Sequence, residues 1–339
     1  MAHTITLIPG DGIGPEVTAA VIRIFTAAGL EIEWDRQEAG VIAFKRFGQS
    51  LPPALLESVK RNKVALKGPV TTPIGEGFTS VNVGLRKALD LFSNLRPVKH
   101  LPGVSSRFED VDLIIVRENT EDLYAGLEHE IVPGIVESIK IITERASTRI
   151  ARFAFEFART HGRKRVTAIH KANCFLMTDG LFMEAVHHVA KEFPQVELDD
   201  LLVDASTAHL VRTPERFDVI CATNFFGDIL SDLASELSGS LGLAGSVNAS
   251  ATHCCAQAQH GSAPDIAGQN VANPTSMILS VAMLLNWMGT RYAKPAFHQA
   301  ASAMEQAVDT VLANPATRTR DLGGKMKTDE FGHHVARAI

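Results

Sequence analysis

The sequence predicts an α/β protein with a largely parallel sheet. Short β-branched runs recur along the chain, and helical patterns such as 147–159 and 178–191 separate most of them. This alternation is typical of parallel sheets covered by helices, and no internal repeat or low-complexity linker interrupts it. If there are two domains, they share a continuous sheet or one is inserted in the other. Strands are expected at residues 4–8, 31–34, 64–67, 111–117, 165–170, 196–203 and 217–221.

Composition indicates an ordinary packed soluble protein. The 339 residues allow two domains or one large one, and 45% of them are hydrophobic. The net charge of -5, with no basic block, gives no indication of nucleic acid or membrane partners. The first strand follows the N-terminus directly, which leaves no room for a targeting peptide, and no apolar run would span a bilayer. A cytoplasmic location is therefore expected for the protein. Its four cysteines, Cys174, Cys221, Cys254 and Cys255, are expected to be reduced thiols.

Residues 223–232, Thr-Asn-Phe-Phe-Gly-Asp-Ile-Leu-Ser-Asp, indicate a metal site. They follow the expected strand at 217–221 and open a helical pattern over 228–237. Asp228 and Asp232 are four residues apart, so on a helix their side chains point the same way. Like charges on one face repel unless a cation lies between them, and Mg2+ or Mn2+ prefers oxygen ligands. The stretch alone also fits a helix start, where aspartate favours the helix dipole.

Two further polar residues end neighbouring strands. Asp204 and Lys171 each follow an expected strand, and α/β sheets build their sites at the carboxyl ends of strands. The gathering of Asp204 with Asp228 and Asp232 favours the metal interpretation. The pKa of a lysine at such an edge falls beside a metal or other cations. Taken alone, however, Lys171 fits a solvated surface lysine better.

Residues 10–16, Gly-Asp-Gly-Ile-Gly-Pro-Glu, predict a tight turn between a strand and a helix. The spacing differs from the dinucleotide fingerprint G-x-G-x-x-G, because Pro15 and Glu16 crowd the place of a pyrophosphate. The sequence therefore does not predict a Rossmann site.

Polar residues also gather in and after a glycine- and proline-rich loop at 67–75. Several of them fit a loop leading into a first helical turn, where backbone N–H groups face outward. Guanidinium groups hold carboxylates bidentately, so three arginines near element ends could bind a polycarboxylate. Each arginine alone fits a surface position better. The residues concerned are Lys67, Thr71, Ser80, Asn82, Arg86, Arg96 and Arg117.

A tyrosine and a long loop complete the candidates. Tyr124, one of two tyrosines, lies in a polar turn after a strand. It fits either a general acid or a packed ring with a hydrogen-bonded hydroxyl. The loop at 260–274 consists of small residues, which let a ligand approach the backbone. A ligand is favoured over a mobile connection, because long loops in compact domains are usually functional or disordered.

Together these pieces resemble the metal-dependent β-decarboxylating dehydrogenases of 2-hydroxy acids, which act on isocitrate, homoisocitrate, isopropylmalate or tartrate and D-malate. The resemblance extends from the turn at 10–16 to Asp-Leu-Gly-Gly at 321–324 and covers nearly the whole chain. It rests on Arg117 with Tyr124, on Lys171-Ala172-Asn173, on Asp228 with Asp232, and on residues 260–267.

The resemblance implies a non-Rossmann α/β/α fold with two domains that share a sheet. The cofactor-binding domain would contain residues 1–98 and 249–339, and residues 99–248 would carry the contact of a homodimer. In this family the active site is shared between subunits, so a monomer should be inactive. Lys171 and Asp204 of one chain would then meet Arg117, Tyr124, Asp228 and Asp232 of the other.

The resemblance also implies the chemistry. The metal would be held by Asp204, Asp228 and Asp232, bind the substrate's hydroxyl and carboxylate, and lower the hydroxyl pKa. Lys171, coupled to Asp204, would help to remove that proton as hydride leaves for the nicotinamide. The metal would stabilise the enolate that remains after carbon dioxide leaves, and Tyr124 with Lys171 would supply the proton to carbon.

The loop around Ser80 indicates the substrate. Isocitrate enzymes typically show S-x-N-x-x-L-R, which residues 80–86 match, and Ser80 with Asn82 would meet the third carboxylate. Isopropylmalate enzymes have an apolar residue there. The run at 134–140 also resembles the isocitrate branch. Homoisocitrate is the close alternative, because one methylene gives little discrimination. The other implied substrate contacts are Arg86, Arg96 and Arg117.

The position after Ala263-Pro264 indicates the cofactor. NADP-dependent members have a Lys-Tyr pair there, whereas this chain has Asp265-Ile266. A carboxylate accepts hydrogen bonds from ribose hydroxyls and repels a 2'-phosphate, so NAD is expected. The remaining implied contacts are Thr71 on the nicotinamide side, Asn273 on the adenine, and His260, Gly261, Ser262, Ala263 and Pro264 in the loop.

Three departures accompany the resemblance. The family's second lysine after Lys171 is Leu176, a usual glutamate is Gln257, and Ala244 stands where proline is common. Gln257 puts one nicotinamide-side contact in doubt. A regulatory subunit of a hetero-oligomeric isocitrate dehydrogenase is an alternative, although the catalytic residues named above are all present. A nucleotide-binding module would not need the arginines.

Overall fold

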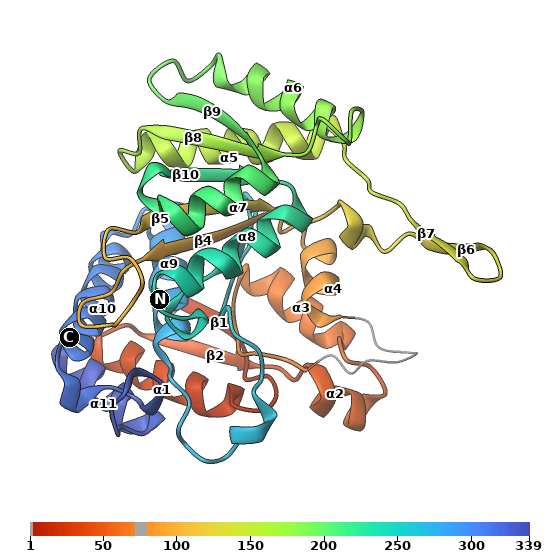
Figure 1. Cartoon of the computed structure of the whole chain (residues 1–339). Helices are drawn as coiled ribbons and strands as arrows, with labels where there is room; N and C mark the ends of the chain where they lie inside the picture. The colour runs from red at the N-terminus through yellow and green to blue at the C-terminus, as the bar shows by residue number, and fades with distance from the viewer. Residues whose placement is uncertain (1–2, 72–79) are drawn as a thin grey trace. The chain divides into compact units, whose positions relative to one another are not determined.

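The computed structural model describes residues 3–71 and 80–339 and divides the chain into two compact units. Unit 1 contains residues 1–89, 101–106 and 239–339, and unit 2 contains residues 90–100 and 107–238. Both chain ends therefore belong to unit 1 (Figure 1). The domain boundaries at 98/99 and 248/249 remain a prediction.

Unit 1 is built on five strands in the order β2 (Ile32–Arg36), β1 (His3–Ile8), β3 (Val64–Lys67), β12 (Cys254–Gln257) and β11 (Val247–Ala249). The strands pair in parallel, except for the antiparallel pair of β11 and β12. Every residue of β3 and β12 is buried, which is typical of parallel strands covered on both faces. The helices of this unit are α1 (Gly14–Ala27), α2 (Gly40–Phe47), α3 (Pro53–Asn62), α4 (Val81–Ala88), α9 (Thr275–Tyr292), α10 (Pro295–Ala313) and α11 (Thr328–Ala338).

Unit 2 is built on strands in the order β4 (Ser93–Lys99), β5 (Asp112–Glu118), β10 (Val219–Ala222), β8 (Arg165–His170) and β9 (Glu197–Leu202). Only β4 pairs antiparallel, with β5. A separate antiparallel hairpin of β6 (Glu128–Val132) and β7 (Ile135–Ser138) projects from this unit (Figure 1). The helices are α5 (Glu144–Thr160), α6 (Thr178–Ala190), α7 (Val203–Arg212) and α8 (Asn224–Leu237).

Alternating apolar residues in β5 divide the core of unit 2 into two layers. Ile114 and Val116 face α5 and α6, whereas Leu113 and Ile115 face α7 and α8. Successive side chains of a strand point to opposite faces, so a strand that is apolar throughout is buried on both. Unit 2 is therefore an α/β/α sandwich.

The α/β class predicted from the sequence is confirmed, and all seven expected strands are present. The expectation of a largely parallel sheet needs the correction that β4 and β11 are antiparallel. The sequence analysis missed β4, β6, β7, β11 and β12. No helix in the described part of the chain is both long enough and apolar enough to cross a membrane.

Candidate active site

The two aspartates predicted to bind metal lie on α8 in unit 2. Buried β10 leads directly into α8, which begins at Asn224 rather than at Asp228 as the helical pattern suggested. Asp228 is therefore in the second turn, where it cannot cap the helix, and the first turn contains no acidic residue. Asp228 and Asp232 are partly exposed, with side-chain exposures of 33% and 54%. The helix-capping alternative for Asp228 is thus excluded.

Two of the predicted arginines lie against these aspartates. Arg117, 1% exposed, forms an ion pair with Asp228 and donates from Nε and Nη2 to Asn224 Oδ1, at 3.0 and 2.7 Å. Arg96, 5% exposed, lies 3.5 Å from Asp228 and 3.0 Å from Asp232. Burial, with a contribution from the neighbouring Arg117, lowers the pKa of Arg96 to about 10, so the Arg96 guanidinium group is charged at neutral pH. The site thus concentrates buried positive charge beside two carboxylates.

Tyr124 belongs to the same cluster. It lies in the 3-10 turn Leu123–Ala125, and its hydroxyl donates a hydrogen bond to Asp228 Oδ2. The Arg117 guanidinium carbon is 5.2 Å from the centre of the tyrosine ring. Burial, followed by the Asp228 carboxylate, raises the pKa of Tyr124 above its usual value. The hydroxyl therefore keeps its proton at neutral pH, as a proton donor must.

Lys171 and Asp204 form a second group in unit 2. Lys171 Nζ is 2.8 Å from Asp204 Oδ1, and this hydrogen bond lowers the pKa of Asp204. Asp204 lies in the first turn of α7, and its side chain is 66% exposed. The Lys171 backbone N–H donates to Asp179, and the Lys171 carbonyl accepts from the backbone N–H of exposed Cys174, at 2.6 and 2.9 Å. Hydrogen bonds thus hold both backbone groups of Lys171, and the Asp204 side chain is open to solvent.

The carboxylates fit a divalent cation only in part within one chain. In residues 3–71 and 80–339, no three His, Cys, Asp or Glu side chains come together as a metal site. Asp228 and Asp232 are brought together, whereas Asp204 does not join them. One or two carboxylates completed by water and substrate oxygens suffice for Mg2+, so the pair on α8 suits such an ion.

The glycine turn of residues 10–16 organises the predicted cofactor side in unit 1. Its Asp11 carboxylate accepts hydrogen bonds from the backbone N–H groups of Thr71, Val41 and Ile42, at 2.9, 3.1 and 3.3 Å. The Ile13 N–H donates to the Ser262 carbonyl at 2.9 Å. Two predicted cofactor residues thereby meet, because the hydroxyl oxygens of Thr71 and Ser262 are 2.7 Å apart. The sequence analysis did not identify this role of Asp11.

His260 has an unused ring nitrogen that suits a ligand. Its Nδ1 is 2.9 Å from the Gly261 carbonyl, and since a carbonyl only accepts, Nδ1 carries the proton. Burial lowers the pKa of His260, so the ring is neutral and Nε2 is an acceptor. Nε2 is buried and has no partner among the described residues. A ribose hydroxyl of a dinucleotide would satisfy it, so the loop fits the predicted cofactor.

Two other predicted cofactor residues, Asp265 and Asn273, differ in how accessible their side chains are to a ligand. Asp265 is exposed in the 3-10 turn Pro264–Ile266, after Ala263 with a positive φ of 37°. The side-chain amide of Asn273 already forms hydrogen bonds within the chain, which the sequence did not indicate. Its Nδ2 donates to Asp321 at 2.9 Å, and its Oδ1 accepts from Thr275 N–H at 3.0 Å. Asp321, part of the Asp-Leu-Gly-Gly stretch, thus holds Asn273 in place.

The predicted substrate loop lies around α4 in unit 1. Ser80 caps this helix by accepting from the Val83 N–H at 3.5 Å, and Arg86 is buried in its last turn. The Asn82 Oδ1 is buried without a partner among the described residues, which suits a ligand. Residues 72–75 of the loop predicted at 67–75 lie outside the described residues.

Lys67 is a buried lysine in unit 1 whose chemistry the sequence did not reveal. It is 2% exposed, and its ammonium group donates to the Gly68 carbonyl at 2.9 Å. Burial lowers its pKa from 10.5 to about 8. The only signal in the sequence was a lysine that ends a buried strand.

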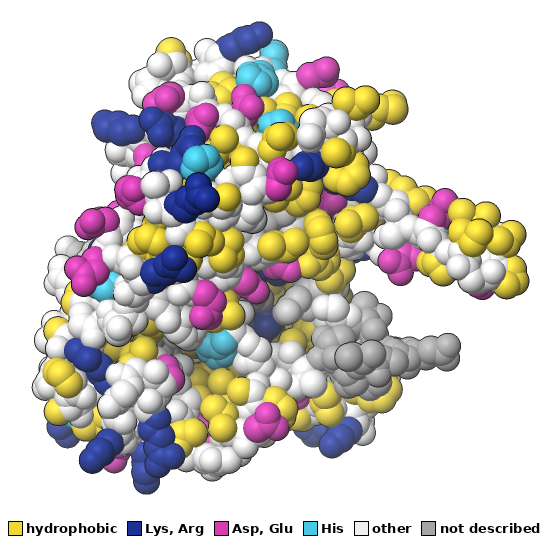
Figure 2. All heavy atoms as spheres, in the orientation of Figure 1, with side chains coloured by type: hydrophobic (Ala, Val, Ile, Leu, Met, Phe, Trp, Pro, Cys, Tyr) yellow, Lys and Arg dark blue, Asp and Glu magenta, His cyan; other side chains and the backbone are white. Residues whose placement is uncertain are grey.

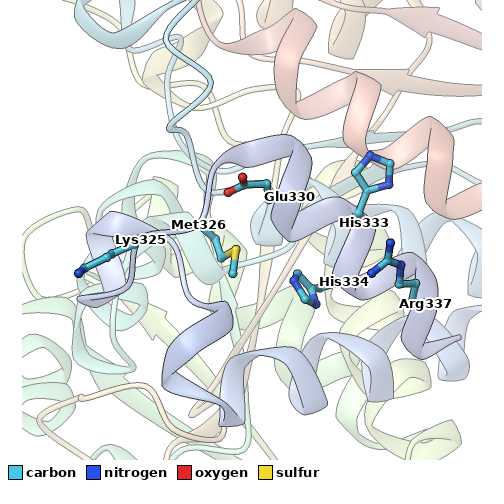
Figure 3. Close-up of a pocket in the computed structure, with 6 residues that line it drawn as sticks. All are labelled: Lys325, Met326, Glu330, His333, His334 and Arg337. Atoms are coloured by element: carbon cyan, nitrogen blue, oxygen red, sulfur yellow. The ribbon is translucent and has the colours of Figure 1, made fainter.

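Another part of unit 1 has a pocket of about 510 Å3 that contains none of the predicted site residues (Figure 3). It is lined by Lys325, Met326, Glu330, His333, His334 and Arg337.

Comparison with known proteins identifies the family. The model of the isocitrate/isopropylmalate dehydrogenase family matches residues 4–335. The chain belongs to the isocitrate/isopropylmalate dehydrogenase family. It is therefore an enzyme of the family that the sequence resembles, and small molecules are its substrates.

Individual members of the isocitrate/isopropylmalate dehydrogenase family match along most of the chain. The mitochondrial catalytic subunit 5 of NAD isocitrate dehydrogenase from Arabidopsis thaliana is 49% identical over 97% of this chain and 86% of its own length. The chloroplastic 3-isopropylmalate dehydrogenase of Solanum tuberosum is 50% identical over 83% of this chain and 79% of its own. The crystal structure of isocitrate dehydrogenase from Methylococcus capsulatus is 45% identical, with a TM-score of 0.94 over 99% of both chains.

The cytoplasmic location predicted from the sequence is contradicted. Several isocitrate dehydrogenase relatives are named as mitochondrial, whereas the sequence analysis expected a cytoplasmic location. The prediction rested on reduced thiols and on the first residues of the chain. Buried thiols are equally compatible with the reducing interior of a mitochondrion, so they did not distinguish the two compartments.

Proposed function

We propose that this enzyme catalyses the oxidative decarboxylation of isocitrate to 2-oxoglutarate with NAD and Mg2+ or Mn2+. The observation that carries the proposal is the cluster of Arg96, Arg117, Tyr124, Asp228 and Asp232 in unit 2. It combines two buried guanidinium groups, two carboxylates on one helix face and a protonated phenol.

The buried arginines suit a substrate with several carboxylates. Arg117 and Arg96 are too buried for their charge to be screened well by solvent, so they attract anions strongly. The match of residues 80–86 to S-x-N-x-x-L-R supports a third carboxylate at Ser80 and Asn82. The amide oxygen of Asn82 has no partner among residues 3–71 and 80–339, which is consistent with a ligand there.

The chain's own residues supply the proton transfers of the reaction. Lys171, hydrogen-bonded to the Asp204 carboxylate, would help to remove the proton of the substrate hydroxyl, a step that requires its Nζ as the neutral amine. Tyr124 donates its phenolic proton to the carbon that loses carbon dioxide, and its raised pKa keeps that proton available. Arg96 and Arg117 hold the carboxylates and fix the reacting carbon beside Tyr124.

Two bound groups complete the chemistry. Asp228 and Asp232, with Asp204 of a second subunit, would hold the divalent cation, which acts as a Lewis acid on the substrate's hydroxyl and carboxylate oxygens. The loop from His260 to Ile266, with Thr71 and Asn273, would hold NAD, which takes up the hydride. The exposed Asp265 carboxylate disfavours the 2'-phosphate of NADP, and the name of the Arabidopsis relative agrees with NAD.

A homodimer with shared sites belongs to the proposal. The β6–β7 hairpin projects from unit 2 and carries apolar side chains along it (Figure 2). Contiguous exposed apolar side chains are typical of protein interfaces. Those on and beside the hairpin are Leu127, Ile131, Val132, Ile135, Val136 and Ile139, each at least 39% exposed.

Isopropylmalate is the second candidate substrate, because the potato relative at 50% identity is a 3-isopropylmalate dehydrogenase. Homoisocitrate is a third, since it differs from isocitrate by one methylene. A regulatory subunit is disfavoured, because Tyr124, Lys171, Asp204, Asp228 and Asp232 are all present.

The test is NADH formation by the purified chain with Mn2+, comparing isocitrate, homoisocitrate and 3-isopropylmalate as substrates. We expect turnover of isocitrate with NAD, a kcat/KM at least about tenfold lower with NADP, and loss of activity with a chelator that added Mn2+ reverses. Asp228→Asn is the inactive control. A preference for 3-isopropylmalate or homoisocitrate would refute the substrate assignment, and no turnover of any of them would refute the catalytic proposal.

A further inference from the structure

Asp122 is a buried aspartate with an unusual backbone in unit 2. It directly precedes the 3-10 turn that contains Tyr124, and it is 0% exposed. Its φ and ψ are 72° and -151°, in a region that residues with a side chain rarely adopt. Such a conformation persists only where the surrounding contacts impose it. The contacts of the Asp122 carboxylate therefore hold this backbone conformation in place.

The Asp122 carboxylate joins the tyrosine turn to the helix of the metal-binding aspartates. Oδ1 accepts from the Leu123 N–H and Oδ2 from the Phe225 N–H, both at 2.9 Å. Leu123 precedes Tyr124, and Phe225 lies in the first turn of α8, one turn before Asp228. The Asp122 N–H also donates to the Ile141 carbonyl at 2.8 Å. One side chain thus fixes both elements to each other.

Asn224 makes a second connection between the same elements. Its Nδ2 donates to the Glu121 carbonyl at 3.0 Å, and its Oδ1 accepts both hydrogen bonds from Arg117. The turn, α8 and Arg117 are therefore tied together, and Asp122 provides the only acceptor on the Phe225 N–H that the described residues show. The first N–H groups of a helix have no partner within the helix, and the Asp122 carboxylate satisfies this one.

We infer that Asp122 is a positioning residue that sets the Tyr124 hydroxyl against Asp228. The inference rests on the proposed function of Tyr124 as proton donor. Asp122 does not touch the substrate. It acts by keeping two groups on different elements in register, and a displacement of about 1 Å in such an arrangement lowers turnover by about 100-fold.

The test uses Asp122→Asn, which keeps the shape of the side chain. Asparagine tolerates positive φ, but its amide nitrogen cannot accept, so one of the two backbone bonds is lost. We expect kcat to fall by about 10- to 100-fold. In a chain that already carries Tyr124→Phe, the same change should lower kcat by less than about threefold, because the group that Asp122 positions is gone. A general structural role would instead lower kcat by the same factor in both backgrounds.

Asp90→Asn is the matched control. Asp90 is also an aspartate of unit 2 with positive φ, at 46°, but its partner is Arg149 and its side chain is 59% exposed. This variant should keep the wild-type kcat. If Asp122→Asn does not fold, Asp122→Gly replaces it in the cycle, because glycine adopts the same φ without strain.

A second readout does not depend on activity. The chain has two tyrosines, so incorporation of 3-fluorotyrosine gives two 19F resonances, which Tyr124→Phe assigns. Asp122→Asn should shift the Tyr124 resonance and leave that of Tyr292 unchanged. A kcat within about threefold of wild type, or equal factors in both backgrounds, would overturn the inference. If none of the three substrates is turned over, the proposed function fails, and an unmoved Tyr124 resonance then overturns the inference independently.

Discussion

Lys67 shows how strongly a single position can change a side chain's properties. A lysine with 2% exposure loses the hydration of its ammonium group, and the hydrogen bond to the Gly68 carbonyl replaces little of that hydration. Burial therefore lowers its pKa from 10.5 to about 8. The free energy lost by burying the charged ammonium group makes the folding stability depend on pH.

We expect the stability difference between wild type and Lys67→Met to change with pH. Between about pH 8 and 10.5 the unfolded lysine binds a proton that the folded lysine has released, so wild-type stability rises with pH. The full rise is about 3 kcal/mol, from roughly 1.4 kcal/mol per pKa unit, and it is absent in Lys67→Met. Urea unfolding of both chains at about pH 7 and about pH 10 measures it.

Lys60→Met is the control for this experiment, because Lys60 is exposed on α3. Its stability difference from wild type should stay constant between the two pH values. An equally constant difference for Lys67→Met would show that Lys67 is not perturbed.

The candidate site was predictable where a residue type and its spacing carry the chemistry. Asp228 and Asp232 are four apart on a helix, and the structure places them together with Tyr124, Arg96 and Arg117. Asp122 was not singled out, and Lys67 was named only as one of the polar residues of the loop at 67–75. Their importance comes from a buried carboxylate with two backbone donors and from the burial of an ammonium group, and neither is visible in a linear pattern.

At the scale of elements, α8 determines the geometry of the cluster. Its face against β5 is so close that a Cβ on Gly227 would lie 2.6 Å from Arg117 Cγ and 2.8 Å from its Cβ. The glycine therefore lets the arginine side chain lie across the helix. Substitution here should act on Arg117 rather than on the helix itself.

We predict that Gly227→Ala raises the KM for the substrate at least about tenfold and destabilises the chain by about 1–3 kcal/mol, because Arg117 must move. Gly180→Ala on α6 is the matched control, since a Cβ there meets nothing within 4 Å. It should leave KM unchanged and stabilise the chain by about 0.4–1 kcal/mol. Steady-state kinetics and urea unfolding of both variants measure these changes. A KM of Gly227→Ala equal to that of the wild type would refute the role given to Gly227.

Elements were predictable in proportion to their apolar pattern. Strands with buried β-branched residues, such as β1, β5 and β8, were expected. The missed β4 contains Arg96 and Pro97, and β12 reads Cys-Cys-Ala-Gln, so neither has the pattern of a strand. These strands form because their neighbours supply hydrogen-bond partners, which is a tertiary effect.

At the scale of the whole molecule, shared active sites make a sharp prediction. Lys171→Met and Asp228→Asn should each be inactive alone. Mixed and reassembled in equal amounts, they should recover about a quarter of wild-type activity, because half of the dimers are mixed and each has one intact site. Activity measured before and after the exchange of subunits tests this.

The outcome against shared sites would be equally clear. If each chain used its own Lys171 and Asp228, every site in the mixture would lack one of them, and no activity would return. A mixture of Lys171→Met with Lys171→Arg is the control, because it has no intact lysine in any arrangement. Size-exclusion chromatography of the mixture establishes that dimers have formed.

The burial of the cysteines has a practical consequence for labelling. Burial raises the pKa of Cys221 to about 12 and that of Cys255 to about 11, and it raises the pKa of Cys254 well above its usual value. Since the thiolate is the form that reacts, these three are inert to alkylating reagents in the folded chain. Cys174 is exposed, and its N–H donates to the Lys171 carbonyl. A maleimide dye would therefore attach once per folded chain, three residues from the proposed base, without any engineered cysteine.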